Sequence, residues 1–272
     1  MAGHRRIGEG IRPDPVLVSL RGAASRHRVV DSRIGGARVA EMRVTFYGHS
    51  CFLLEAAGAR VLIDPFLTGN QQASIAAEDV RCDTILLSHG HEDHTCDALE
   101  IARRNNALIV GNYEIAEYFA AKGARTHGLN PGGGFRFPFG RVSLTLAQHT
   151  SSLGDPLNPV YMGVACGLLI SAEGRKVYHA GDTALFLDMQ LIGRAGLDLA
   201  MIPIGDNFTM GPDDALESLG LLQPKIAVPM HYNTWPVIAQ DVDEFARRAA
   251  ARGHHVEVLP PGGILELSPI AP

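Results

Sequence analysis

The chain contains the stretch Ser88-His89-Gly90-His91-Glu92-Asp93-His94, which puts three imidazoles and two acidic side chains into seven consecutive residues. It follows a predicted strand at 84–87 and precedes a predicted helix at 97–105, so it forms the turn between them. Imidazole and carboxylate are good ligands for zinc and similar divalent ions, and a loop at a strand end can hold their spacing. The stretch therefore predicts a metal site, whereas a solvated polar loop is the alternative without chemistry.

Three further side chains that could bind a metal end predicted strands downstream of this stretch. They are His149 in Leu-Ala-Gln-His, Asp182 in His-Ala-Gly-Asp-Thr and His231 in Val-Pro-Met-His-Tyr. Loops held by rigid strands often carry functional side chains. Each of these three lies where a loop faces a common edge, so we expect them to join the first cluster.

The order H-x-H-x-D-H, followed by His, Asp and His, resembles the metallo-β-lactamase superfamily over essentially residues 42–267. Every position of the superfamily's ligand pattern is filled. The resemblance implies two metal ions with the following ligands: His89, His91 and His149 for the first, Asp93, His94 and His231 for the second, and Asp182 bridging both. We further assign catalytic roles to Asp93 and His231.

Four shorter motifs resemble a narrower family of metal-dependent hydrolases related to ascorbate-6-phosphate lactonase. They are Tyr-Gly-His-Ser at 47–50, Ile-Asp-Pro-Phe at 63–66, Gly-Asp-Asn-Phe-Thr-Met-Gly-Pro at 205–212 and Met-His-Tyr-Asn-Thr-Trp-Pro at 230–236. This resemblance implies hydrolysis and leaves the substrate open.

A pair of metal ions about 3.5 to 4 Å apart can hold a bridging water and lower its pKa toward neutrality. Such a water would attack a small-molecule ester, lactone, amide or phosphoester, and Asp93 would accept its proton. Ligation by nitrogen and oxygen alone favours zinc, and manganese, iron, nickel or cobalt also suit such a site.

Other classes of function are weighed against this hydrolase. A metallonuclease or phosphodiesterase could use the same metal pair, but the formal net charge is -5 and no basic insertion follows Asp182. A redox di-iron protein would usually present Glu where this chain has His91. Ser50 or Cys51 as nucleophile would lack an independent oriented base. A catalytically silent metal-binding module is the remaining alternative.

Several polar side chains are candidates for secondary roles. His49 is expected to contact substrate or a metal-bound water, or to be a hydrogen-bonded structural histidine. Asp64 is expected to accept hydrogen bonds from a ligand histidine or from the metal loop, with turn capping as the alternative. Four others are expected to line the pocket or to build its loops through hydrogen bonds: Asn207, Thr209, Asn233 and Thr234. Cys96, close to His94, is expected to be a packed thiol rather than a ligand.

The pattern of elements predicts one large α/β domain. Of the 272 residues 46% are hydrophobic and 19% charged, which suits a globular protein with a sizeable interior. Strands are predicted at 43–47, 51–55, 60–63, 84–87, 108–110, 141–147, 161–170, 176–179, 197–203, 225–229 and 256–259, and helices at 97–105, 114–122, 212–222 and 237–252. Two β-rich halves, each flanked by helices, predict a four-layer αβ/βα sandwich, the metallo-β-lactamase fold.

Residues 1–41 hold eight arginines and no sustained apolar period, so we expect a disordered extension before a hydrolase domain at 42–272. Met42 directly precedes the first strand, which suggests a misassigned start. An arginine-rich targeting leader is the alternative, and Glu9, Asp14 and Asp31 argue against it. The four cysteines form no C-x-x-C pair, and no apolar run is long enough to cross a bilayer. We expect a cytoplasmic protein that acts on a small molecule. It is expected to bind neither nucleic acid nor membrane, and a homo-oligomer is compatible with the sequence.

Overall fold

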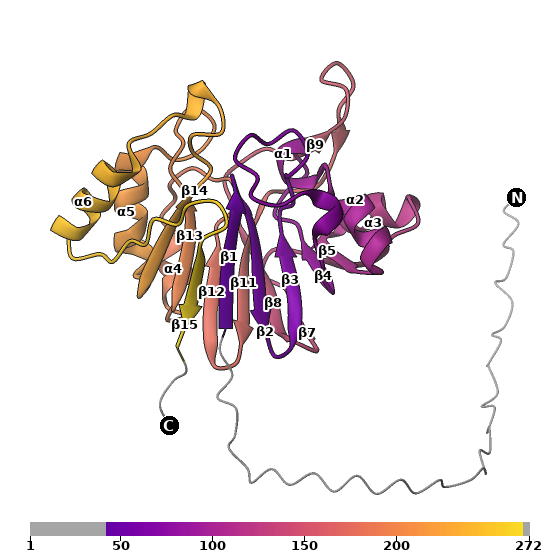
Figure 1. Ribbon diagram of the computed structural model, residues 1–272, viewed down its shortest axis with the longest axis horizontal. Helices are drawn as coiled ribbons and strands as arrows, with labels where there is room; N and C mark the ends of the chain where they lie inside the picture. Colours follow the sequence, from indigo (N-terminus) through magenta and orange to yellow (C-terminus); the bar gives the residue numbers. More distant parts are fainter. Residues whose placement is uncertain (1–41, 269–272) are drawn as a thin grey trace, which may run out of the picture. The chain divides into compact units, whose positions relative to one another are not determined.

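The computed structural model describes residues 42–268, which form two large sheets with helices outside them and a separate two-stranded sheet (Figure 1). The seven-stranded sheet has the order β15 (Ile264–Leu267), β1 (Met42–Gly48), β2 (Cys51–Ala56), β3 (Ala59–Ile63), β4 (Thr84–Leu86), β5 (Leu108–Asn112) and β6 (Arg125–Leu129). The six-stranded sheet has the order β14 (Ile226–Met230), β13 (Leu199–Pro203), β12 (Arg175–His179), β11 (Cys166–Ala172), β8 (Gly140–Leu146) and β7 (Gly134–Phe137). The extension predicted at 1–41 lies outside the described residues.

Helices and short elements connect these strands. They are η1 (Ala77–Asp79), α1 (Glu92–Thr95), α2 (Ala98–Asn105), α3 (Tyr113–Ala121), β9 (Ser152–Leu153), β10 (Val160–Tyr161), α4 (Met189–Gly193), α5 (Pro212–Leu222), η2 (Pro236–Ile238) and α6 (Val242–Ala251). Helices α2 and α3 lie beside β4 and β5 on one side of the molecule, and α5 and α6 lie on the other (Figure 1).

Alternation along the strands explains the layers. In β2, Phe52 and Leu54 belong to the core that the two sheets share, whereas Leu53 belongs to a second core with α2 and α3. A strand covered on both faces buries both sets of alternate side chains. The second sheet likewise contributes Leu168 and Ile170 to the shared core. The structure therefore confirms the predicted four-layer αβ/βα sandwich.

Three predicted elements differ from the structure. The strand predicted at 161–170 is divided between β10 and β11, because the Asn112 side chain donates to the carbonyls of Met162 and Val164 and fixes a turn there, with Gly163 at φ 76°. The helix predicted at 237–252 begins only at Val242, where Asp241 caps the amide of Glu244.

The third difference is the strand predicted at 256–259, which is reduced to one isolated bridge between Val256 and Ala227. Strands β6, β7 and β15 were not predicted, because they are edge or half-exposed segments with weak apolar alternation. No helix in residues 42–268 is long and apolar enough to span a membrane.

Candidate metal centre

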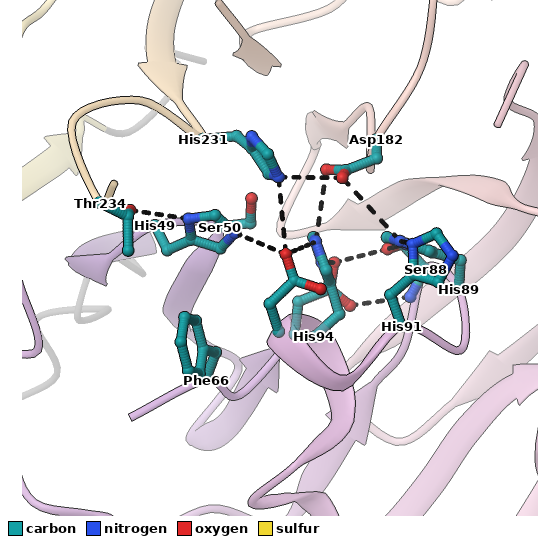
Figure 2. Close-up of polar contacts among 12 residues, drawn as sticks. His49, Ser50, Phe66, Ser88, His89, His91, His94, Asp182, His231 and Thr234 are labelled. Atoms are coloured by element: carbon teal, nitrogen blue, oxygen red, sulfur yellow. Dashed lines mark hydrogen bonds and ion pairs between the residues drawn. The ribbon is translucent and has the colours of Figure 1, made fainter. Parts of the chain in front are cut away.

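All seven predicted metal ligands converge at one end of the two sheets. Four lie in the turn from β4 into α1, and the others follow β8, β12 and β14, so each sheet contributes ligands. Figure 2 shows His94, Asp182 and His231 pointing toward one another. The turn that follows β4 approaches Met162 closely at Gly90, where an added Cβ atom would lie 2.2 Å from the Cβ of Met162. The Gly90 amide donates to Ser151 Oγ at 3.0 Å. Glycine therefore lets the histidine turn pack against the 151–162 segment.

The first group of ligands is His89, His91 and His149. His91 Nδ1 lies 3.0 Å from His89 Nε2 and 3.3 Å from His149 Nε2. Asp182 Oδ2 is 3.9 Å from His89 Nε2 and 3.7 Å from His149 Nε2. Zinc–nitrogen bonds of about 2.0 to 2.1 Å in tetrahedral geometry put neighbouring ligand atoms about 3.3 to 3.4 Å apart. The spacing of this group therefore fits a divalent metal ion.

The second group is Asp93, His94 and His231, and Asp182 lies between the two groups. His231 Nε2 is 3.0 Å from Asp182 Oδ2, and His94 Nε2 is 3.3 Å from Asp182 Oδ1. Asp93 Oδ2 is 3.7 Å from His231 Nε2 and 3.8 Å from His94 Nε2. One carboxylate thus approaches both groups, as a bridging ligand would.

Buried atoms without hydrogen bonds test whether these residues suit a metal. Within residues 42–268, His94 Nε2 and Asp182 Oδ1 make no hydrogen bond, although they lie 3.3 Å apart. Their separation allows an ion pair, but their geometry does not make a hydrogen bond. Buried polar atoms in proteins almost always have partners. A cation between the two groups would satisfy both atoms, so the donor set fits a metal ion.

Asp64 and Ser88 orient two of the ligand imidazoles. Asp64 Oδ2 accepts from Ser88 Oγ at 2.5 Å and from His94 Nδ1 at 2.9 Å, and its Oδ1 accepts from the Ser88 amide at 2.8 Å. Because Ser88 Oγ donates to Asp64, it accepts from His89 Nδ1, which lies 2.9 Å away. Both His89 and His94 therefore donate through Nδ1, which leaves Nε2 as the atom that each imidazole turns toward the centre for a metal.

His49 lies beside the second group of ligands. It is fully buried in the β1–β2 turn with φ 57°, and its Nδ1 is 2.8 Å from Thr234 Oγ1. Thr234 Oγ1 donates to Gln72 Oε1 at 3.2 Å, so it accepts the proton of His49 Nδ1. His49 Nε2 then faces Asp93 Oδ2 at 3.2 Å (Figure 2). His49 thus lies close enough to Asp93, His94 and His231 to share a metal ion with them.

Electrostatics favour ligand-competent protonation states in the first group. Burial lowers the pKa values of His89, His91 and His149, so their imidazoles are neutral near pH 7. Burial would raise the pKa of Asp182, but the neighbouring His231 and His94 outweigh it and hold that pKa well below its usual value. Neutral imidazoles and ionised carboxylates are the forms that bind metals.

The second group holds protons more tightly without a metal. Burial would lower the pKa of His231, but Asp182 and Asp93 outweigh it and raise that pKa to about 9. Burial would also lower the pKa of His94, but Asp182 and Asp93 outweigh it and hold that pKa well above its usual value. Beside this group, the pKa of His49 falls to about 4, first because of burial and then because of His231. A metal ion bound here would displace protons from the second group.

A cavity of about 640 Å³ opens over the two groups. Ligand side chains form its base, and its wall contains Phe66, Phe208, Trp235 and Val237. Cys96 also lines it and is not among the clustered ligand atoms.

Four polar residues were candidates for lining this cavity, and none of them is among its lining residues. Asn207 is exposed, Thr209 donates to the Met210 carbonyl, and Asn233 accepts from the Gln240 amide. Thr234 contacts His49 instead. The aromatic residues that do line the cavity were not predicted, although Phe66, Phe208 and Trp235 stand inside the quoted motifs.

Comparison with known proteins gives one family. The β-lactamase superfamily domain matches residues 43–231. The UPF0173 metal-dependent hydrolase of Opitutus terrae is 51% identical over 228 residues, which cover 83% of this chain and all of that protein. The UPF0173 metal-dependent hydrolase of Pelotomaculum thermopropionicum is 51% identical over 229 residues, with the same coverage.

A solved structure agrees with these relatives. Igni18, a metallo hydrolase from the archaeon Ignicoccus hospitalis, superposes with a TM-score of 0.77 at 36% identity and covers 84% of this chain and 99% of its own. The chain therefore belongs to the metallo-β-lactamase superfamily and, within it, to the UPF0173 family of metal-dependent hydrolases.

Proposed function

We propose that this hydrolase uses two divalent metal ions, zinc in the first instance, to cleave a small-molecule ester, lactone, amide or phosphoester. The observation that carries the proposal is the position of Asp182, whose carboxylate lies within 3.9 Å of ligand nitrogens from both groups. When bound, the metals would supply Lewis acidity and a water of lowered pKa. The remaining functions fall to the residues of the chain.

The two ligand carboxylates differ in their access to the cavity. The side chain of Asp93 is 25% exposed, whereas that of Asp182 is 2% exposed. Asp93 can therefore receive a proton from a water in the cavity and pass it to solvent or to the leaving group. Asp182 is almost fully buried at the base of the cavity and is suited to holding the two ligand groups together. His231 contacts both carboxylates and fixes their orientation.

The ligand chemistry limits the metal only to a class. Five imidazoles and two carboxylates suit zinc, and also manganese, iron, nickel or cobalt. Elemental analysis of the purified protein identifies the bound metal. The chain's four cysteines, which form no C-x-x-C pair, support a reducing compartment such as the cytoplasm.

A small molecule is a better substrate candidate than nucleic acid. The formal net charge of -5 gives no general attraction for a polyanion. The cavity volume lies within the range of about 300 to 1,000 Å³ found for small-molecule sites.

A substrate panel tests this function. The protein, as purified and after removal of metal by a chelator, is assayed against p-nitrophenyl esters, γ- and δ-lactones, a β-lactam and bis(p-nitrophenyl) phosphate. We expect hydrolysis of one class by the metal-loaded protein and its loss from the Asp182→Ala variant. Undiminished hydrolysis by the Asp182→Ala variant would show that the turnover comes from elsewhere. Cleavage of RNA or DNA at a higher rate than any small molecule would favour the nuclease instead.

A further inference from the structure

The wall of the cavity beside the second group of ligands is aromatic, and its rings are held in place by contacts with one another and with His49. The rings of Phe66 and Trp235 lie 5.8 Å apart between centroids. Both rings meet the buried His49 imidazole edge to face, at 5.4 Å for Phe66 and 5.1 Å for Trp235. Figure 2 shows Phe66 beside His49. Contacts of this kind orient rings beyond what apolar burial alone would do, so the wall is preformed.

Two further apolar side chains extend this wall toward solvent. Phe208 is 55% exposed and Val237 is 54% exposed, and both line the cavity. Phe208 follows Asp206 and Asn207, which have φ values of 61° and 53°. Asp and Asn adopt the left-handed conformation more readily than other residues with a side chain, and the Asn207 amide donates to Asp206 Oδ1 within this turn. The turn therefore holds an exposed phenylalanine at the cavity mouth, which fits a surface that a ligand covers.

The charged residues around the cavity are those of the metal site and Glu92. Among the lining residues of the described chain there is no Lys or Arg, and the acidic ones are Glu92, Asp93 and Asp182. The uncharged polar side chains are Thr68 and Thr150. A phosphate or carboxylate on the distal part of a substrate would therefore lose water against aromatic rings without gaining a cation.

We propose that the substrate carries an uncharged apolar group, aryl or branched alkyl, on the side of its scissile bond away from the metals, and that Phe66, Trp235, Phe208 and Val237 bind this group. The inference rests on the proposed function, because the metals must hold the other end of the substrate. The inference excludes, as preferred substrates, molecules whose distal group is phosphorylated or carboxylated.

Three hydroxamates with the same metal-binding head test the inference. Acetohydroxamate has no distal group, phenylacetohydroxamate has an apolar one, and 4-carboxyphenylacetohydroxamate has a charged one. Calorimetry measures their dissociation constants with the full-length, metal-loaded protein at about 0.3 M salt, where exposed charges are screened. Trp235 is the single tryptophan of the chain, so its fluorescence reports whether the cavity is occupied.

We expect phenylacetohydroxamate to bind at least about tenfold more tightly than either other probe and to change the Trp235 fluorescence. Equal or tighter binding of the carboxylated probe would overturn the inference. Binding of acetohydroxamate with no gain from the phenyl group would overturn the inference and leave the metal centre standing. Failure of acetohydroxamate to bind the metal-loaded protein would instead contradict the proposed function.

Matched variants locate the effect. Phe208→Ala removes an exposed ring from the wall, and we expect it to weaken phenylacetohydroxamate about fivefold to tenfold without changing acetohydroxamate. Phe135→Ala is the control, because Phe135 is 46% exposed on β7 and is not a lining residue of the cavity. Val237→Lys places a cation in the wall, so it should narrow or reverse the preference against the carboxylated probe. A Phe208→Ala variant with unchanged affinities would show that the wall does not bind the distal group.

Discussion

Replacing Asp64 by asparagine changes one atom and is expected to weaken both metal sites. In the native protein Asp64 Oδ2 accepts protons from Ser88 Oγ and His94 Nδ1. In Asp64→Asn, the amide oxygen must stay at the Oδ1 position to accept the Ser88 amide, so an NH₂ group replaces Oδ2. This group is a donor that faces two donors.

The network can relieve this conflict only by moving protons. His94 would accept at Nδ1 and carry its proton on Nε2. Ser88 Oγ would accept from the new amide and donate to His89 Nδ1, so His89 would also carry its proton on Nε2. In both imidazoles the proton would then occupy the nitrogen that faces the centre. Because His89 and His94 belong to different ligand groups, both metals are affected.

The loss of such a hydrogen bond to a ligand histidine typically weakens metal binding by about 10 to 100-fold, or about 1.4 to 2.8 kcal/mol. The assay is competition for zinc between the metal-free protein and a chelating dye, which gives a dissociation constant for each site. Ser88→Ala removes the acceptor of His89 and one donor to Asp64, but it leaves His94 Nδ1 its acceptor on Asp64, so it should weaken the first site more than the second.

Asp97→Asn is the matched control. Asp97 is also buried, and its carboxylate accepts from the amides of Leu67 and Thr68 and from Thr68 Oγ1, but it contacts none of the proposed ligands. Both variants should unfold at lower denaturant concentration than the native protein, because each loses a charge-assisted hydrogen bond of about 1.5 to 3 kcal/mol. Only Asp64→Asn should lose zinc affinity. An Asp64→Asn variant with zinc affinities within about twofold of the native values would refute the positioning role of Asp64.

Three further predictions concern the bridge, a distant carboxylate and the extension. Asp182→Ala should lose both metals, whereas His49→Ala should retain them. Counting the bound metal per chain tests this, and two equivalents of metal in Asp182→Ala would exclude a bridging role for Asp182. Asp198 accepts hydrogen bonds from three donors, which lower its pKa against the opposing effect of burial. Its carboxylate therefore stabilises the fold above its usual pKa of about 3.9, and this stabilisation is lost as the pH falls through the lowered pKa of the folded state. At pH 7 the free energy of unfolding of Asp198→Asn should be about 1 to 2 kcal/mol lower than that of the native protein. This difference should shrink below pH 4, and an equal difference at pH 7 and below pH 4 would contradict the role of Asp198. A chain that starts at Met42 should match the full-length protein in melting temperature, metal content and turnover, and a salt-sensitive fall in melting temperature would show that residues 1–41 contribute.

Local spacing made four of the candidate metal ligands predictable. His89, His91, Asp93 and His94 stand within six residues, and their chemistry shows in the order of residue types alone. The buried strands were also predictable, because alternation such as that of β2 is written in consecutive residues.

Features set by distant residues were not predictable in this way. The division of the strand at 161–170 depends on Asn112, which lies 50 and 52 residues before the two carbonyls that it binds. Cavity membership likewise depends on how loops turn, so polar Asn207 lies outside while its neighbour Phe208 faces inward. The contact of His49 with Asp93 needed the approach of two loops that only the folded chain provides.

The most direct test of the metal mechanism is a zinc titration of chelator-stripped protein that follows bound metal and hydrolysis together, with the best substrate of the panel. We predict no hydrolysis by the metal-free chain and a rate that rises to a plateau at two equivalents of zinc, because the seven ligands form two groups that share Asp182. Full hydrolysis by the metal-free protein would contradict this account.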